Sequence, residues 1–136
     1  MFRDRLVLIV EDNAFLALDL SQAIEELDGR VAGPTAHVSE AIELLDREDI
    51  AAAIVDCHLK GQDVVVLTGK LAERDVPFIF QVETSLPENV GALHPEVPVL
   101  RKPIQPQTVM ECLIAEMHKV TGELHTSFTT EIRESR

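Results

Sequence analysis

The chain has 136 residues, the size of about one ordinary domain, and 46% of them are hydrophobic, which is enough for a core. Its two cysteines, Cys57 and Cys112, do not make a disulfide framework. Asp and Glu number 24 against 12 Lys and Arg, and with a net charge of −12 and no Trp or Tyr for base stacking we expect no binding to nucleic acid. No signal peptide is evident, and no stretch approaches the roughly 18 to 20 apolar residues of a membrane span, so we expect a cytoplasmic protein without a membrane partner.

The first part of the chain predicts a strand, a helix and a short second strand. The run from Leu6 to Val10 is apolar and rich in β-branched residues, as in a buried strand. Asn13 can cap the helix that follows, and Gly29 is typical of its end. The second strand is expected from Arg30 to Gly33, with Pro34 ending it. One face of the intervening helix carries apolar residues at spacings of three and four: Leu16, Leu20, Ile24 and Leu27.

The middle of the chain repeats the alternation of helix and strand. Ser39 opens a second helix, and Ala51 to Val55 form a nearly all-apolar third strand. A loop from 57 to 63 leads into a short third helix. The inner face of the second helix is expected to carry Val38, Ile42 and Leu45, and that of the third Val64, Leu67 and Leu71.

The last part predicts two more strands and a long final helix. The strands are expected at Pro77 to Val82 and at Val97 to Leu100. The segment 83–96 between them contains two prolines and a glycine, so we expect it to be mobile or irregular, with a helix no longer than Glu88 to Leu93. The final helix carries an apolar stripe, and we place the domain at 4–124 and a polar tail at 125–136. The stripe is Met110, Leu113, Met117, Val120 and Leu124.

Strands that alternate with helices predict a parallel sheet with right-handed crossovers. Five such units fit a flavodoxin-like (βα)5 three-layer sandwich with strand order 2-1-3-4-5. The first and third strands would then be neighbours, about 4.8 Å apart, with their carboxyl ends at one edge of the sheet. A polar site is expected at that edge.

Charged residues stand at the ends of the predicted strands. Glu11 and Asp12 follow the first strand, Asp56 ends the third, and Lys102 follows the fifth. Each alone has an ordinary explanation, such as an acid at a helix N-terminus or a surface lysine. Together at one edge the acids would repel one another unless a cation joined them. The pattern therefore points to a hard divalent ion and a phosphoryl group, and so to signalling.

On these residues the chain resembles the receiver domains of two-component response regulators, over roughly residues 4–122. The resemblance rests on the acidic pair Glu11-Asp12, on Asp56, and on the pair Lys102-Pro103. The spacing agrees as well, since 44 residues separate Asp12 from Asp56 and 46 separate Asp56 from Lys102. With no output domain following, the chain looks like a single-domain regulator.

The resemblance implies a role for each acid. Asp56 would accept a phosphoryl group from a phosphohistidine of a sensor histidine kinase. Asp12 and Asp56 would bind Mg²⁺ directly, Glu11 through water, and the backbone carbonyl of His58 would complete the protein ligands. Such a site agrees with the preference of Mg²⁺ for a few oxygen ligands plus waters.

The resemblance also assigns the lysine and the biological role. Lys102 would pair with a phosphoryl oxygen, aimed by a cis bond to Pro103, and metal and lysine together would neutralise the transferring group. The protein would be a phosphoacceptor with slow self-dephosphorylation rather than an enzyme. It would act in a phosphorelay as a shuttle, as a phosphate sink or by binding another regulator protein, without direct control of transcription.

Two positions depart from the receiver pattern. Receivers normally carry Thr or Ser at the end of the fourth strand, where this chain has Val82. They carry an aromatic switch residue three positions before the lysine, where this chain has Val99. We therefore expect phosphorylation to be chemically possible and its readout to be unusual, running through the segment 83–96.

The start of the fourth strand resembles part of a Phe-x-Phe-Ala-Thr-Gly-Tyr motif found in alphaproteobacterial receivers that are served by HWE-type kinases. Here Phe78-Ile79-Phe80 is followed by Gln81-Val82-Glu83-Thr84, so the likeness is partial. It indicates a kinase class and a stress or light signal.

Two further positions draw attention by their place in the receiver pattern. His58 and Thr84 lie two residues after the acceptor and two after the switch position, where receivers flank the path of hydrolytic water. We therefore expect them to tune phosphoryl lifetime. Cys57 is read as a small buried side chain rather than a redox group.

Two other functions compete with the phosphoacceptor. A pseudo-receiver, binding a partner without phosphate, would account for Val82 and Val99. A hydrolase with an aspartate nucleophile fits less well, since such enzymes usually carry a second acid where this chain has His58, and they usually carry a cap domain.

Overall fold

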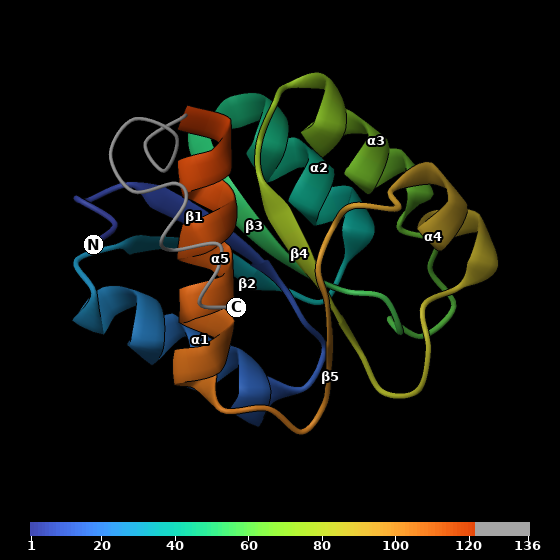
Figure 1. Cartoon of the computed structure of the whole chain (residues 1–136), viewed down its shortest axis with the longest axis horizontal. Helices are drawn as coiled ribbons and strands as arrows, with labels where there is room; N and C mark the ends of the chain where they lie inside the picture. Colours follow the sequence, from blue (N-terminus) through green and yellow to red (C-terminus); the bar gives the residue numbers. More distant parts are fainter. Residues whose placement is uncertain (122–136) are drawn as a thin grey trace.

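The computed structural model describes residues 1–121, which form one five-stranded sheet with helices on both faces (Figure 1). All strand pairs are parallel, and the strand order is β2-β1-β3-β4-β5. This confirms the predicted flavodoxin-like fold. The strands are β1 Leu6–Val10, β2 Arg30–Thr35, β3 Ile50–Asp56, β4 Phe78–Val82 and β5 Val99–Arg101. The helices are α1 Ala14–Glu26, α2 Val38–Arg47, α3 Val65–Glu73, α4 Glu88–Leu93 and α5 Pro106–Thr121.

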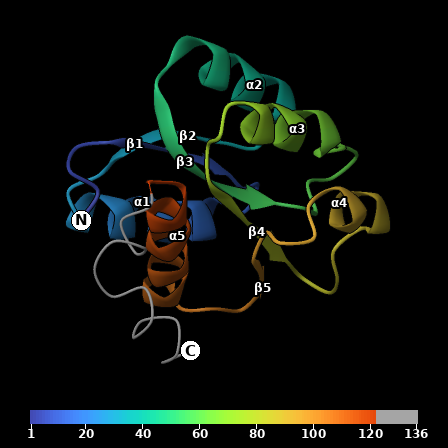
Figure 2. The ribbon, with the colours of Figure 1, turned by 45° about the horizontal axis from the view of Figure 1, so that its top comes forward.

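Three layers are visible when the molecule is turned (Figure 2). Helices α1 and α5 cover one face of the sheet and contact each other, while α2 and α3 cover the opposite face. The short α4 lies beyond the β4–β5 side of the sheet. Helices on both faces leave the central strands no exposed side, as expected where parallel strands are joined by crossovers.

The two faces of the sheet carry separate hydrophobic cores. Leu8 and Val55 point into the core under α2 and α3, and Ile9 and Ile54 point into the core under α1 and α5. Each of these four side chains is fully buried. Because side chains alternate along a strand, the unbroken apolar runs of β1 and β3 are the sequence signature of burial on both faces.

The predicted end of the second strand is wrong. Pairing continues through Pro34 to Thr35, with a register irregularity where Val10 pairs with Thr35. The peptide bond before Pro34 is cis, and Gly33 adopts a φ of 91° that favours glycine. The strand tolerates proline because it is at the sheet edge, where a missing N–H does not interrupt a ladder.

The carboxyl-terminal half differs from expectation mainly at the fifth strand. It is three residues long and starts at Val99, rather than spanning 97–100. The short helix expected at Glu88–Leu93 is present as α4. The final helix is confirmed to Thr121, and Leu124 and the tail 125–136 lie outside the described residues. None of the helices within residues 1–121 combines the length and apolar character needed to cross a membrane.

Candidate functional site

Three carboxylates meet at the carboxyl edge of the sheet, as predicted. Glu11 and Asp12 directly follow β1, and Asp56 is the last residue of β3. The two strands are neighbours, with Val10 paired to Val55, so the residues that follow each strand come together. One oxygen from each acid lies within 4.8 Å of the others.

Two of the acids are buried where charge is costly. Glu11 is 3% exposed and Asp56 is 1% exposed, whereas Asp12 faces solvent. Burial, joined by the charge of Asp56, raises the pKa of Glu11 to about 7. The backbone N–H of Asn13, which donates to Glu11 Oε2 at 3.1 Å, and Lys102 oppose this rise. The site is thus short of positive charge.

Lys102 bridges the two buried acids. Its ammonium lies 3.0 Å from Glu11 Oε1 and 3.1 Å from Asp56 Oδ2. Burial on its own would lower the pKa of Lys102, but the hydrogen bonds and charges of Glu11 and Asp56 outweigh it and raise the pKa. The backbone N–H of Lys102 donates to the Val82 carbonyl at 2.8 Å. The peptide bond to Pro103 is cis, as the resemblance implied.

The turn after β3 holds the second oxygen of Asp56. The backbone N–H of His58 donates to Asp56 Oδ1 at 2.9 Å, and so both carboxylate oxygens have a donor. His58 Nε2 is buried and finds no hydrogen-bond partner in residues 1–121. Burial, together with the charge of Asp56, raises the pKa of the Cys57 thiol to about 12, which fits a small packed side chain better than a redox group.

The donor set fits a hard divalent cation. All three acids offer oxygen, the ligand type that Mg²⁺ prefers, and exposed Asp12 leaves an open side for the metal's waters. Glu11 Oε1 is buried near Lys102 but accepts no well-directed hydrogen bond from the residues described, so it retains a free lone pair. Glu11, Asp12 and Asp56 would therefore hold Mg²⁺, and a cation there would relieve the repulsion between the buried acids.

The two positions that depart from the receiver pattern lie in different environments. Val82 is 2% exposed and belongs to the core under α2 and α3, while Val99 is 42% exposed at the start of β5. Neither offers a hydroxyl or an aromatic ring. Thr84 is exposed in the loop after β4, outside any regular element. The proposed roles of His58 and Thr84 in phosphoryl lifetime stay predictions.

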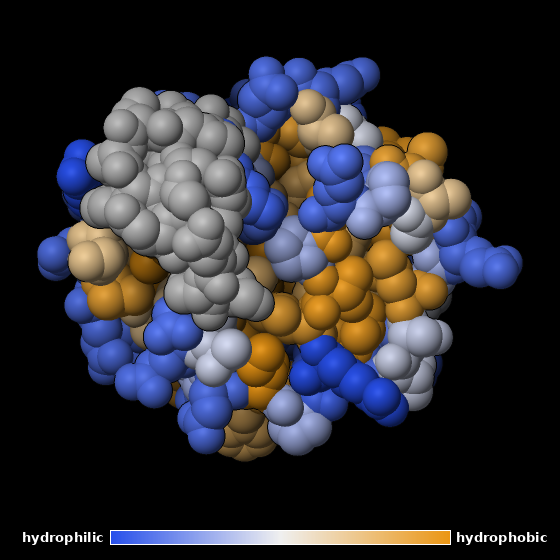
Figure 3. All heavy atoms as spheres, in the orientation of Figure 1, coloured by the Kyte–Doolittle hydropathy of each residue, from blue (hydrophilic) through white to orange (hydrophobic). Residues whose placement is uncertain are grey.

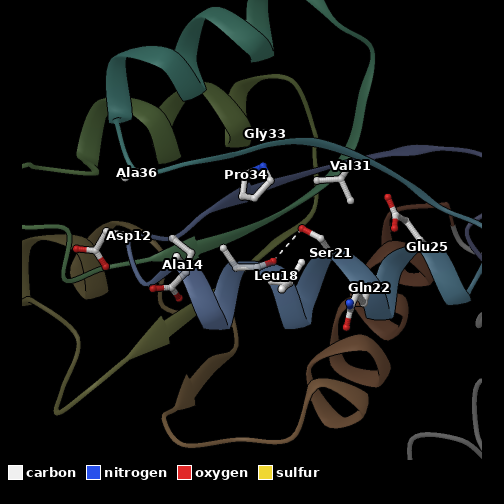
Figure 4. A pocket seen from close by; sticks show the side chains of 12 residues that line it. Asp12, Ala14, Leu18, Ser21, Gln22, Glu25, Val31, Gly33, Pro34 and Ala36 are labelled. Atoms are coloured by element: carbon white, nitrogen blue, oxygen red, sulfur yellow. Dashed lines mark hydrogen bonds between the residues drawn. The ribbon is translucent and has the colours of Figure 1, made fainter.

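A groove of about 730 Å³ leads away from the acids along α1 (Figure 4). Its far wall is β2, with Pro34 facing the helix; Asp12 stands at one end, and Glu11 also lines the groove. Two large apolar side chains of α1 are exposed, Phe15 at 81% in the first turn of the helix and Leu18 at 54% in the lining of the groove. Exposed apolar side chains beside a polar site are typical of a surface that meets another protein.

Sequence reasoning assigned no role to Gln81, although it is 4% exposed and pairs directly with Asp56 across the sheet. The available signal was a polar residue inside the otherwise apolar run of β4. The hydrogen bond from the backbone N–H of Asn13 to Glu11 was also missed. The sequence predicts Asn13 as a helix cap, but it does not predict the direction of the N–H of that residue.

Comparison with known proteins identifies the family. No family model and no curated protein matches the sequence. Among solved structures, the signal receiver domain of a modulated diguanylate cyclase from Desulfovibrio desulfuricans G20 is 28% identical, with a TM-score of 0.75, and the match covers 87% of this chain and 97% of that one. A CheY-like receiver domain protein from Methanospirillum hungatei JF-1 shares the fold at 20% identity, with a TM-score of 0.76 and coverages of 88% and 98%. The chain is a response regulator receiver domain.

A further neighbour of this receiver is SdrG from Sphingomonas melonis Fr1, which is 30% identical with a TM-score of 0.72. The match spans 86% of this chain and 98% of SdrG. The receiver thus aligns with nearly the full length of each of these structures.

Proposed function

We propose that this receiver accepts a phosphoryl group on Asp56 from a phosphohistidine of a sensor histidine kinase. The observation that supports this proposal most directly is the position of the Lys102 ammonium. It lies 3.1 Å from Asp56 Oδ2, at the sheet edge where three carboxylates converge. In the transfer, an Asp56 oxygen forms a bond to phosphorus as the phosphorus–nitrogen bond of the phosphohistidine breaks. The imidazole is the leaving group.

The surrounding residues would stabilise the negative charge on the phosphoryl group during the transfer. Lys102 is already oriented toward the acceptor and would pair with a phosphoryl oxygen. Bound Mg²⁺, held by Glu11, Asp12, Asp56 and the carbonyl of His58, would neutralise further charge on the phosphoryl group. The backbone N–H of His58 fixes the acceptor carboxylate, which keeps the other oxygen aimed at Lys102.

The biological role proposed is that of a stand-alone phosphoacceptor in a phosphorelay. It would act as a shuttle, a phosphate sink or a regulator that binds other proteins, with slow self-dephosphorylation and no small-molecule turnover. The partial motif at Phe78-Ile79-Phe80 supports an HWE-type kinase as its donor. The exposed Phe15 and Leu18 of α1 offer an apolar contact for that kinase.

The readout would run through the segment 83–96 rather than through a hydroxyl and an aromatic switch. This segment leads to an apolar surface, visible in Figure 3 over the region where Figure 1 places β5 and the chain from α4. Leu93, at the end of α4, is 58% exposed, and Val99 is 42% exposed. A regulator protein that bound this surface would sense changes in the position of α4.

A second candidate, a pseudo-receiver that binds its partner without phosphate, is favoured by one observation. Val82 is buried and Val99 carries no ring, so neither usual reporter of phosphorylation is present. Binding by the same apolar surface would then be independent of Asp56.

Phosphorylation with a small phosphodonor and with a histidine kinase distinguishes the two. We expect Mg²⁺-dependent, base-labile incorporation into the wild type and none into Asp56→Asn. Asp63→Asn, which changes an exposed acid in the following loop, is the matched control and should be labelled like the wild type. Absence of label under conditions that phosphorylate another receiver would favour the pseudo-receiver.

The proposed tuning positions are tested on the phosphorylated protein. We expect His58→Ala and Thr84→Ala, made separately, to change the rate at which the label is lost. Unchanged rates in both would show that neither residue controls access of water.

A further inference from the structure

Gln81 is a buried polar residue in the apolar strand β4. It is 4% exposed, and its side-chain carbonyl oxygen is buried without a hydrogen-bond donor among the residues that the structure describes. Leaving a buried acceptor unpaired is costly, and an apolar residue would avoid that cost. We therefore expect the side-chain oxygen of Gln81 to accept a hydrogen bond in another state of the site, from a donor that moves within reach.

The sheet places Gln81 beside Asp56, the acid that Lys102 contacts. Gln81 pairs with Asp56 on β3 and with Leu100 on β5, and paired residues of neighbouring strands point to the same face. Lys102 follows the last residue of β5, and its ammonium lies 3.1 Å from Asp56 Oδ2 on that face. Its ammonium reaches Asp56 and Glu11, beyond β4, and so the side chain passes the carboxyl end of β4, where Gln81 lies beside Asp56.

Gln81 and Lys102 also line one cavity, of about 310 Å³. Its apolar walls, Leu16, Pro103 and Ile104, would strengthen a polar contact made inside it. The other polar lining residue, Glu83, is exposed, whereas Gln81 offers a buried oxygen. Among these lining side chains, the Lys102 ammonium is the charged donor.

We propose that Gln81 is a positioning residue for Lys102, and that its carbonyl oxygen receives the ammonium when Mg²⁺ occupies the carboxylates. Lys102 now uses Glu11 and Asp56, the same acids that would bind the metal. Mg²⁺ bound to these carboxylates would repel the ammonium. Lys102 must then find another hydrogen-bond acceptor while it stays close to Asp56. Gln81 supplies that acceptor beside Asp56. The inference rests on the proposed phosphoacceptor function, for which Lys102 must stay near Asp56.

A double-mutant cycle on Mg²⁺ affinity tests this coupling. Gln81→Met keeps a long unbranched side chain and removes the acceptor. With Lys102 present, it should weaken Mg²⁺ binding by about tenfold, the effect of one lost charged hydrogen bond, because the displaced ammonium has no partner. In Lys102→Met, where nothing needs to be displaced, the same change should leave the affinity unchanged. Affinities come from titrating Mg²⁺ into ¹⁵N-labelled protein.

The matched control is Gln107→Met, the same chemical change at an exposed position of α5, which should not alter Mg²⁺ affinity. Equal weakening by Gln81→Met in both lysine backgrounds would indicate a structural role and overturn the inference. So would unchanged affinity with Lys102 present, or a wild type that binds no Mg²⁺.

A second measurement needs no Gln81 variant. The side-chain NH₂ resonances of Gln81 should shift when Mg²⁺ is added to the wild type and should shift much less in Lys102→Met. Equal shifts in both would contradict the proposal. Because neither measurement uses phosphate, failure to label Asp56 would overturn the proposed function separately from this coupling.

Discussion

At the scale of single residues, Lys102 is what allows two acids to be buried side by side. Removing one partner from a buried ion pair leaves uncompensated charge, so we expect Lys102→Met to lower the free energy of unfolding by about 3 kcal/mol without metal. Lys119→Met is the control, because Lys119 is 55% exposed and its pair with Glu116 should contribute less than about 1 kcal/mol. Urea unfolding at pH 8 in EDTA measures both, and equal losses would contradict the buried role of Lys102.

The pKa of Glu11 predicts how stability depends on pH. Folding raises this pKa from 4.5 to about 7, so between these values the folded protein binds more protons than the unfolded chain. The stabilisation from Glu11 is therefore complete below pH 4.5 and is lost as the pH rises through about 7. We expect metal-free wild type to lose stability from pH 5 to 8, and Glu11→Gln to lack this component. Parallel profiles for the two proteins in urea unfolding would refute the assignment.

Residue types and spacing were enough to predict which acids and which lysine meet, since the ends of neighbouring parallel strands must coincide. The contacts they make were not predictable in the same way. The pairing of Lys102 with Glu11, as well as with Asp56, depends on a side chain that passes the carboxyl end of β4. The buried oxygen of Gln81 depends on the same geometry, and sequence alone shows only a polar residue in a strand.

At the scale of elements, two side chains attach α4 to the rest of the molecule, the buried Val90 and, at the C-terminus of the helix, His94. Its Nε2 lies 3.0 Å from the Thr68 hydroxyl of α3, and its ring centroid is 5.4 Å from that of Phe78. A six-residue helix is marginal alone, so we expect His94→Ala to speed amide exchange across α4 at least about tenfold while β1 and β3 exchange as before. Thr68→Val, which removes only the hydroxyl, should produce a smaller increase. Unchanged exchange in both variants would mean that other contacts hold α4.

Element boundaries show where local signals were overridden. Proline usually ends a strand, yet β2 continues to Thr35 because an edge strand needs no N–H on its open side. The fifth strand is shorter than its apolar run, because Val97 and Pro98 precede the pairing that begins between Phe80 and Val99. By contrast, α4 matches its predicted limits because Pro87 and His94 bracket it.

At the scale of the whole molecule, the alternation of strands and helices was enough to predict the strand order, because right-handed crossovers leave few arrangements. Those crossovers bring β1 and β3 together at the centre of the sheet, with a core on each face. The acidic cluster therefore joins the ends of two interior strands, one of them the central β3. Its charge state is coupled to global unfolding rather than to local fraying.

Mg²⁺ should accordingly stabilise the entire domain. A ligand that binds only the folded state adds about 1.4 kcal/mol for each tenfold rise in concentration above its dissociation constant. We expect wild type to follow this line in urea unfolding, and Asp12→Asn to require higher Mg²⁺ for the same gain, because one of the three converging carboxylates is lost. Asp19→Asn changes an exposed acid of α1 outside the cluster and should follow the wild type. If Mg²⁺ stabilised Asp12→Asn and wild type along the same line, the metal would act elsewhere, by general screening of the net charge of −12.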